Sequence, residues 1–319
     1  MSGDQTFDWT LAEAQLVALG ETEANDSADV RRSHIRLADV AGLIDVKTRL
    51  EAAFLAPLRN PELRVLYKRS LGGGLLLYGP PDCGMTYLAR AVAGEMDARF
   101  LPVALVDVLD KWLGQSEQNI RVLFETARAS APCVVFLDGL DALGHVTTSG
   151  LDAVGTRATL NQLLREIDAT GGENEGVFVL GATNRPWDVD TALRHPGRLD
   201  RTLFVSPPDT LAREVLLGLH LQGRPIDPID LHAVARATSG FSGADLAHLC
   251  EIAAQHALMD SAQAGIARNI RQVDVEAAAK EVHPSPAQWL TTARKVALTA
   301  NEGGSYDELV AYLRSRKML

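Results

Sequence analysis

The sequence predicts an α/β fold, with a five-stranded parallel sheet, helices on both of its faces and a small helical domain that follows it in the chain. Three observations support this prediction. Short apolar runs alternate with helical patterns from residue 75 onwards, the runs are apolar throughout, and strand patterns stop after Pro207-Pro208 while helical patterns continue. Unbroken apolar strands that are separated by amphipathic helices are typical of a parallel sheet covered on both faces.

The residues ahead of the sheet are predicted to form one short helix and a linker. Residues 8–19 space their apolar side chains helically between Asp8, a suitable N-cap, and Gly20, a stop signal. Residues 21–33 are polar and aperiodic, which is typical of a linker. The predicted parts of the chain are an N-terminal helix and linker at 1–35, a large α/β domain at 36–207, a helical lid domain at 208–285 and a C-terminal helical extension at 286–319.

Five apolar runs are the predicted strands of the sheet. They are Leu75–Tyr78, Leu101–Leu105, Cys133–Leu137, Val177–Ala182 and Thr202–Val205. Between them, Ser116–Ser130 carries apolar residues on one helical face and ends before Pro132, so it is predicted to be a helix that packs on the sheet.

The residues after Pro207-Pro208 are predicted to form helices alone. A last helix is predicted near 305–316, where Ser305 and Glu308 have the spacing of a capping box. The earlier helical patterns lie near 209–221, 229–238, 243–264 and 271–281.

Composition argues against several classes of protein. Acidic residues outnumber basic ones by 41 to 31 and the formal net charge is −10, which disfavours a broad nucleic-acid interface. Cys83, Cys133 and Cys250 lack the spacing of a zinc site or a disulfide framework, which fits a reducing cytoplasm. The acidic N-terminus has no apolar signal region and no run of apolar residues is long enough for a membrane span. We therefore expect a cytoplasmic protein that binds neither membrane nor nucleic acid.

A phosphate-binding loop is predicted directly after the first strand of the sheet. Its residues are Gly79, Pro80, Pro81, Asp82, Cys83, Gly84, Met85 and Thr86. In such a loop, glycines let backbone N–H groups turn toward phosphate oxygens, and the N-terminus of the following helix adds a positive dipole. The motif G-x-x-x-x-G-K-[ST] requires a lysine where this chain has Met85, so the positive charge on the β- and γ-phosphates is missing.

The order of the motifs along the chain resembles that of the classical AAA clade of ATPases, to which katanin, spastin and the proteasomal ATPases belong. The resemblance covers about residues 36–285 and implies a P-loop NTPase fold that uses ATP or ADP with Mg²⁺. The motifs are Asp39–Gly42, the loop Gly79–Thr86, KWLGQSE, VVFLDGLDAL, GATNRP, ALRHPGRLDR and SGFSGADLAHLC.

The resemblance also implies roles for individual residues. Thr86 and Asp138 would hold Mg²⁺, Asn184 would orient the attacking water, and Arg198 would reach the γ-phosphate bound by a neighbouring subunit. Cofactor contacts are implied for Asp39, Val40, Ala41 and Gly42 near the adenine, for the loop together with Tyr87, and for His220, Gly243 and Ala244. A pore loop that grips a polypeptide client in the channel of a ring is implied at Lys111, Trp112, Leu113 and Gly114.

The chain departs from the pattern of this clade at the positions that perform the chemistry. Asp82 stands for a glycine, Met85 for the lysine, Gly139 for the glutamate after the aspartate that holds Mg²⁺, and His195 for the first arginine finger. The segment Asp168-Ala169-Thr170 replaces an Asp-Gly-apolar relay between subunits. The scaffold is thus retained while the catalytic groups are eroded.

Some of these assignments have simpler alternatives. Met85 could be an ordinary packing residue, Trp112 a core aromatic residue or a surface anchor, and Asn184 a turn residue before Arg185-Pro186. Arg198 could form a surface ion pair near Asp200.

Three hypotheses follow for the whole chain. The first is a catalytically impaired AAA module that serves as a regulatory or structural subunit in a ring with an AAA paralogue or with itself. The second is a slow but active protein-remodelling homohexamer. The third is that some substitutions were engineered, because each of the four motif changes can arise from a single base change.

Overall fold

The computed structural model describes residues 31–60, 62, 66–67, 73–110, 116–144, 151–168, 173–301 and 304–319. The predicted helix at 8–19, the predicted pore loop at 111–114 and Ala169-Thr170 lie outside these residues.

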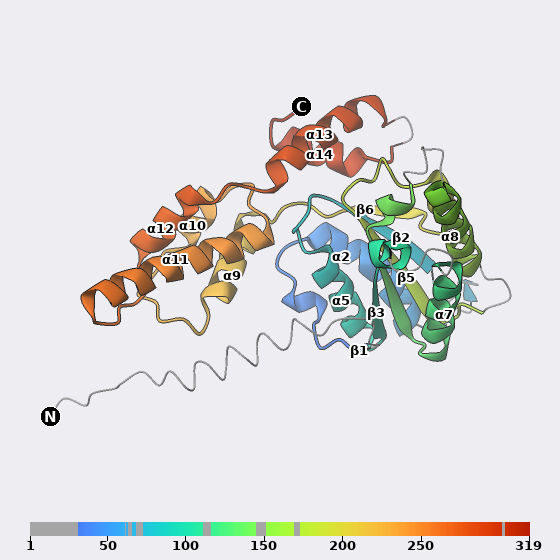
Figure 1. Ribbon diagram of the computed structural model, residues 1–319, viewed down its shortest axis with the longest axis horizontal. Coiled ribbons are helices and arrows are strands. Elements are labelled where there is room, and N and C mark those ends of the chain that lie inside the picture. The colour runs from blue at the N-terminus through green and yellow to red at the C-terminus, as the bar shows by residue number, and fades with distance from the viewer. Residues whose placement is uncertain are drawn as a thin grey trace.

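Within the described residues the sheet has six strands in the order β1-β3-β4-β5-β2-β6 (Figure 1). The pairs β3·β4, β4·β5, β5·β2 and β2·β6 are all parallel, which confirms the five predicted parallel strands. The strands are β1 Arg31–Arg32, β2 Gly73–Tyr78, β3 Arg99–Ala104, β4 Cys133–Asp138, β5 Val177–Thr183 and β6 Arg201–Phe204.

Two details of the strand prediction were wrong. Arg31 and Arg32, predicted to be part of a linker, pair antiparallel with Phe100 and Arg99. They form a strand because they satisfy backbone groups on the outer edge of β3, a task that needs no apolar side chain. For the same reason β3 begins at Arg99, two residues before the apolar run.

Helices cover both faces of the sheet, with α2 and α5 on one side and α7 and α8 on the other (Figure 1). The helical elements of this large domain are the short turns η1 Leu37–Asp39, η2 Glu51–Leu55, η3 Leu140–Leu143 and η4 Thr191–Arg194, and the helices α2 Ile44–Leu50, α3 Ala56–Arg59, α5 Met85–Glu95, α6 Leu105–Asp110, α7 Ser116–Ala129 and α8 Leu151–Ile167.

Alternate residues of each central strand enter the two cores. Leu75 and Leu77 of β2 pack with the α5 side, whereas Leu76 between them packs with the α7 side. All three are at most 1% exposed. Two-sided burial explains why the strands are apolar throughout.

The lid that follows consists of helices with polar N-caps. Asp209 accepts the backbone N–H of Ala212 at 2.7 Å, and Ser242 accepts that of Asp245 at 3.1 Å. Such caps satisfy N–H groups that have no partner within the helix. The lid helices are α9 Thr210–Leu221, α10 Leu231–Ala237, α11 Gly243–Ala264 and α12 Gln272–Glu281.

The C-terminal extension contains two helices, α13 Pro286–Thr299 and α14 Asp307–Ser315. No specific helix was predicted for α13, because alanines at 293 and 297 give its buried face a weak apolar pattern. The predicted capping box of the last helix was wrong. The N-cap is Tyr306, and the Glu308 carboxylate accepts the N–H of Phe204 instead.

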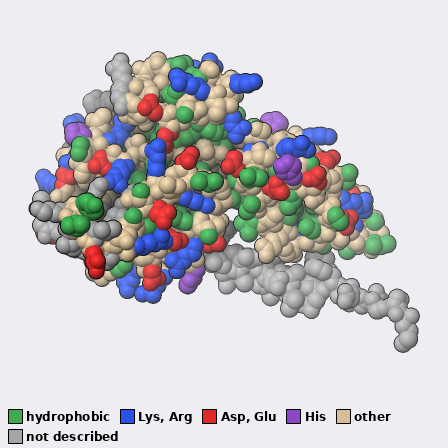
Figure 2. Space-filling model, turned by 180° about the vertical axis from the view of Figure 1, so that it is seen from behind, with side chains coloured by type: hydrophobic (Ala, Val, Ile, Leu, Met, Phe, Trp, Pro, Cys, Tyr) green, Lys and Arg blue, Asp and Glu red, His purple; other side chains and the backbone are tan. Residues whose placement is uncertain are grey.

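Across the described ranges, every helix is either too short or too polar to traverse a bilayer. Basic and acidic side chains are interspersed over the face of the molecule seen in Figure 2.

One ion pair in the lid gives a testable pH dependence. Asp274, which is 8% exposed, accepts two N–H groups of Arg268 at 2.6 and 2.8 Å. The Arg268 hydrogen bonds hold the pKa of Asp274 below its ordinary value. The pair therefore contributes stability that is fully present above the unfolded pKa of about 4 and is lost as pH falls through the folded pKa.

We expect Asp274→Asn to cost about 3 kcal/mol of lid stability at pH 7, because it leaves a largely buried guanidinium without its main partner. Urea unfolding between pH 7 and pH 3 measures the free energy of unfolding of both chains. The difference between the variant and the unsubstituted chain should shrink below about pH 4. Asp260→Asn, which alters the exposed partner of the same arginine, is the matched control and should cost less than about 1 kcal/mol. A difference in unfolding free energy that stays constant over the whole pH range would contradict the lowered pKa of Asp274.

Candidate nucleotide-binding site

The predicted phosphate-binding loop connects β2 to α5 in the strand, loop and helix order that such a loop requires. The N–H of Gly79 donates to the carbonyl of Thr183 on the neighbouring β5. A Cβ atom at Gly79 would collide with the carbonyl oxygen of Val205, so only glycine fits at this position. The loop thus begins at the carboxyl edge of the sheet and ends at the N-terminus of an 11-residue helix.

Asp82 lies in this loop with φ of +60°, a left-handed conformation that favours glycine. Its side chain is exposed, and its carbonyl accepts the N–H of Gly243 at 3.1 Å. The backbone here thus has a conformation that glycine adopts readily, and the AAA pattern has glycine at this position. The chain carries a carboxylate instead, on a loop that is expected to bind phosphates.

Met85 begins α5 and is only 9% exposed, in the apolar cluster between α5 and the sheet. It is thus a packing residue at the position where the motif requires lysine. Cys83 is buried in the same cluster, and burial, followed by the nearby charges of Asp82 and Asp245, raises the pKa of its thiol. The thiol therefore stays protonated and unreactive at neutral pH.

Asp138 is the last residue of β4, and Gly139 follows it. Asp138 is an exposed residue, yet its pKa is raised, mainly because part of its carboxyl group is buried. The hydrogen bond from the N–H of Gly139 lowers this pKa, and the nearby charge of Asp141 raises it. Gly139 has φ of +75° and is the N-cap of η3, and a Cβ atom there would meet no other atom within 4 Å. The position has room for a side chain, but its backbone conformation suits glycine.

Thr183 at the end of β5 connects three parts of the site and was not singled out from the sequence. Its buried hydroxyl donates to Asp141 at 2.6 Å and accepts the N–H of Arg185 at 2.9 Å. Its carbonyl accepts the N–H of Gly79. The sequence signal that could have identified Thr183 is its place in the motif GATNRP, one residue before Asn184.

Asn184 is exposed directly after β5, and its carbonyl accepts the indole N–H of Trp289 from α13. The C-terminal extension therefore contacts the segment that carries the predicted water-orienting residue.

Arg198 is held by its own chain. Its guanidinium donates through Nε and Nη2 to the two carboxylate oxygens of Asp168, the first at 2.7 Å, and through Nη1 to the carbonyl of Ala192 at 2.6 Å. Hydrogen bonding to Asp168 raises the pKa of Arg198. The alternative that Arg198 forms an ion pair within its own chain holds, but the partner is Asp168 and not Asp200, whose carboxylate accepts the N–H of Gly197. His195 is exposed at the end of η4.

Asp39–Gly42 is the part of the large domain that faces the lid. Asp39 is close enough to Tyr87 to raise the pKa of the Tyr87 phenol, although burial has the larger effect. A Cβ atom on Gly42 would lie 2.9 Å from Cβ of Ala212 in α9. This segment therefore lies between the first turn of α5 and the first turn of the lid.

The remaining predicted contacts are on the lid. Gly243 and Ala244 begin α11, where Gly243 reaches the loop at Asp82. His220 is half-buried near the end of α9, and burial, followed by the charge of Arg224, lowers its pKa. His220 is therefore neutral at pH 7. The structure places the loop, Asp39–Gly42 and the start of α11 together.

A nucleotide fits the backbone of this site better than it fits the side chains. The loop N–H groups, the helix N-terminus, and the exposed Thr86 and Asp138 could receive phosphates and Mg²⁺. Asp82 and Met85 do not match a triphosphate, because one adds negative charge and the other provides none of the positive charge. Among the described residues, no group of three or more His, Cys, Asp or Glu side chains could bind a metal ion by itself.

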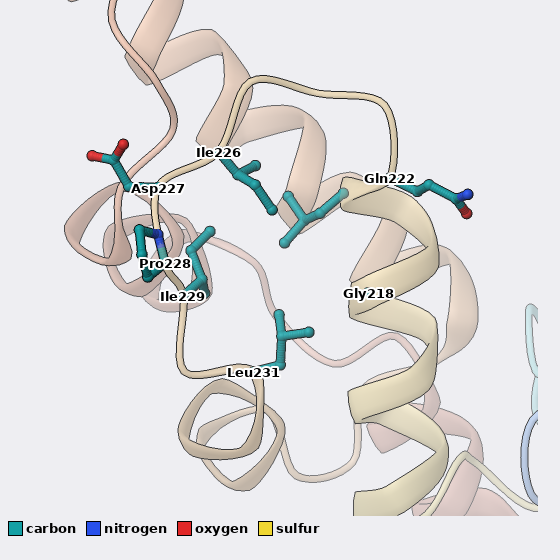
Figure 3. Close-up of a pocket in the computed structure, with 8 residues that line it drawn as sticks. Gly218, Gln222, Ile226, Asp227, Pro228, Ile229 and Leu231 are labelled. Carbon is teal, nitrogen blue, oxygen red and sulfur yellow. The ribbon is translucent and has the colours of Figure 1, made fainter.

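An apolar hollow of about 450 Å³ lies elsewhere in the lid (Figure 3). None of its lining residues is a predicted site residue. They are Gly218, Leu221, Gln222, Ile226, Asp227, Pro228, Ile229 and Leu231.

Comparison with known proteins identifies the class to which this fold and loop belong. Residues 75–207 match the model of the ATPase family associated with various cellular activities (AAA), and residues 228–277 match the AAA+ lid domain. The chain therefore contains an AAA-family ATPase module with its lid.

A relative of the chain is a putative cell division cycle ATPase of Plasmodium falciparum (isolate 3D7), with 39% identity over 224 residues. The alignment covers 70% of this chain and 18% of the relative, so the chain spans less than a fifth of that protein's length.

Proposed function

We propose that this chain is a catalytically impaired AAA module that binds ATP weakly, hydrolyses it near the background rate and acts as a regulatory or structural subunit beside an active AAA paralogue. The observation that supports this most directly is the loop itself. Met85 is packed into the core where a lysine is required, and the exposed Asp82 adds a carboxylate three residues earlier in the same loop.

The magnitudes favour impairment. A lost charge-assisted hydrogen bond costs about 1.5–3 kcal/mol. A carboxylate about 4 Å from a phosphate repels it by about 4 kcal/mol at an effective dielectric constant of about 20. Together these effects weaken ATP binding by several powers of ten. Loss of the glutamate at the position of Gly139 removes a further factor of about 10²–10⁴ in rate.

The experiment that tests this proposal is steady-state ATP turnover of the unsubstituted chain with Mg²⁺, combined with calorimetric titration of ATP. We expect turnover indistinguishable from a no-protein control and weak binding. Turnover on the order of 1 s⁻¹, within the usual enzyme range, would contradict the proposal.

Retention of Arg198 supports a ring shared with an active subunit. An arginine finger is useful only to a neighbour that holds a γ-phosphate. Asp168 holds this arginine within its own chain, so the proposed subunit must exchange that pair for the neighbour's phosphate.

We expect the chain to change the ATPase rate of a closely related active AAA protein when the two are mixed, and Arg198→Ala to abolish the change. Asp168→Asn removes the ion pair of Arg198 and should enlarge the change in the partner's ATPase rate. Arg201→Ala, which removes an exposed arginine of β6, is the matched control. If the partner's rate responds to neither the chain nor Arg198→Ala, the mixed-ring proposal fails.

The retained Thr86, Asp138 and Asn184 favour a second candidate, a slow ATP-hydrolysing remodelling homohexamer. It is distinguished by the same turnover assay together with sedimentation, since it requires measurable hydrolysis by a six-subunit particle of this chain alone. A polypeptide client is part of either proposal. So is a cytoplasmic location, which the three buried free cysteines support.

A further inference from the structure

Residues 285–301 and 304–319, which we call the C-terminal strap, contact the large domain through an aromatic cluster. Tyr78 at the end of β2 and Phe204 at the end of β6 are 1% and 5% exposed beneath the strap. The ring of Tyr306 lies 6.0 Å from that of Tyr78, and the ring of Tyr312 lies 5.4 Å from that of Phe204. The strap therefore packs on the strand that leads into the phosphate-binding loop.

Polar contacts fix the strap on the same domain. The carboxylate of Glu308 accepts the N–H of Phe204 at 2.8 Å and pairs with Arg49 of α2. The indole N–H of Trp289 donates to the carbonyl of Asn184. These contacts reach three separate segments of the large domain.

The same strap also contacts the lid. The backbone N–H and the hydroxyl of Ser285 both donate to the buried carboxylate of Asp245 at 3.0 Å. Near the other end of the strap, Arg316 donates to the hydroxyl of Ser239 at 3.2 Å. In Figure 1, α13 and α14 lie beside both the lid and the sheet.

Between these contacts, the strap reaches the junction of the two domains. Burial raises the pKa of Tyr312, and three neighbours are near enough to act on it: Arg316 and Arg213 lower this pKa, whereas Cys83 raises it. Arg316 lies over the Tyr312 ring, 5.5 Å from its centroid. The buried Arg213 donates to the carbonyl of Pro208, where the chain passes from the large domain to the lid. Tyr312 thus lies where the loop, the lid and the strap meet.

We propose that the C-terminal strap holds the lid against the large domain in one arrangement without nucleotide. The direct hydrogen bond from Gly243 of the lid to Asp82 of the loop belongs to the same arrangement. The strap replaces a bound nucleotide as the bridge between the domains. The module therefore presents the same surfaces to a partner whether or not ATP is present.

Single-molecule energy transfer between a dye on the large domain and a dye on the lid tests this proposal. Glu125→Cys on α7 and Met259→Cys on α11 give two exposed labelling sites in the full chain. The native cysteines are buried, and burial raises the pKa of both Cys133 and Cys250 to about 11, so they react slowly at neutral pH. We expect one narrow peak of transfer efficiency that does not shift with saturating ATP or ADP and Mg²⁺.

Arg316→Ala removes the contact with Ser239 and is expected to broaden the peak. Glu308→Ala, which removes the contact with the large domain, should do the same. Arg314→Ala is the matched control. It replaces an exposed arginine of α14, two residues before Arg316, and should leave the peak unchanged. Arg316 is exposed, so its replacement with alanine should leave the chain folded. The Arg316→Ala variant therefore tests the role of the strap even if Glu308→Ala unfolds.

Three outcomes would overturn the proposal: a broad or double peak in the unsubstituted chain, a peak that shifts with nucleotide, or an Arg316→Ala peak as narrow as that of Arg314→Ala. Calorimetric titration separates this test from that of the proposed function. Tight ATP binding with an unmoved peak would refute impairment while supporting the strap.

Discussion

Replacement of Asp82 with glycine and Met85 with lysine in the same chain is expected to tighten MgATP binding by about a thousand-fold or more. A carboxylate of Asp82 about 4 Å from a phosphate would repel it by about 4 kcal/mol at an effective dielectric constant of about 20, and the glycine removes that repulsion. The lysine restores a charge-assisted hydrogen bond of about 1.5–3 kcal/mol. The left-handed backbone at position 82 already suits glycine, so the loop needs no rearrangement to accept it.

Calorimetric titration of ATP into the double variant, the two single variants and the unsubstituted chain measures this gain. Asp82→Gly with Met85→Leu is the matched control, since it removes the carboxylate but supplies no charge. An affinity of the double variant within about ten-fold of the unsubstituted chain would show that these two positions do not limit binding.

Gly139→Glu in the restored background is expected to raise ATP turnover by about 10²–10⁴. A Cβ atom at position 139 meets open space, so the side chain has room. The left-handed backbone is the obstacle, and we expect it to cost about 1–2 kcal/mol of stability. Activity and stability should therefore change in opposite directions.

Gly139→Gln provides the control, because it carries the same backbone strain without a carboxylate. Thermal unfolding should be lowered equally in both variants, while only the glutamate variant gains turnover in a steady-state assay. Equal turnover in the two would rule out a general base at this position.

The regular core of this fold was predictable, and its edges were not. The run Cys133–Leu137 is apolar throughout because β4 is buried on both faces, so its pattern leaves little ambiguity. Arg31-Arg32 has no such pattern, and its strand exists only because the edge of β3 is there to pair with it. Helix α13 likewise depends on an aromatic surface built by distant strands.

The phosphate-binding loop shows the same division within the site. Its position and the missing lysine at Met85 follow from motif spacing, and the significance of Gly139 follows from the resemblance to the AAA pattern. Thr183 was not singled out from the sequence, because its hydrogen bonds to Asp141 and Gly79 join segments that are distant in the chain.

The sequence by itself determined the alternation of the five parallel strands with helices and the AAA-type motifs, because periodicity and spacing are local properties of a chain, and the resemblance to the AAA pattern showed which side chains are missing from those motifs. Only the tertiary structure decided that Arg198 pairs with Asp168 rather than Asp200, and that Glu308 binds β6 instead of capping its own helix. A charged side chain takes the partner that folding brings nearest, and chain separations of 30 and 104 residues hide that partner from any local pattern.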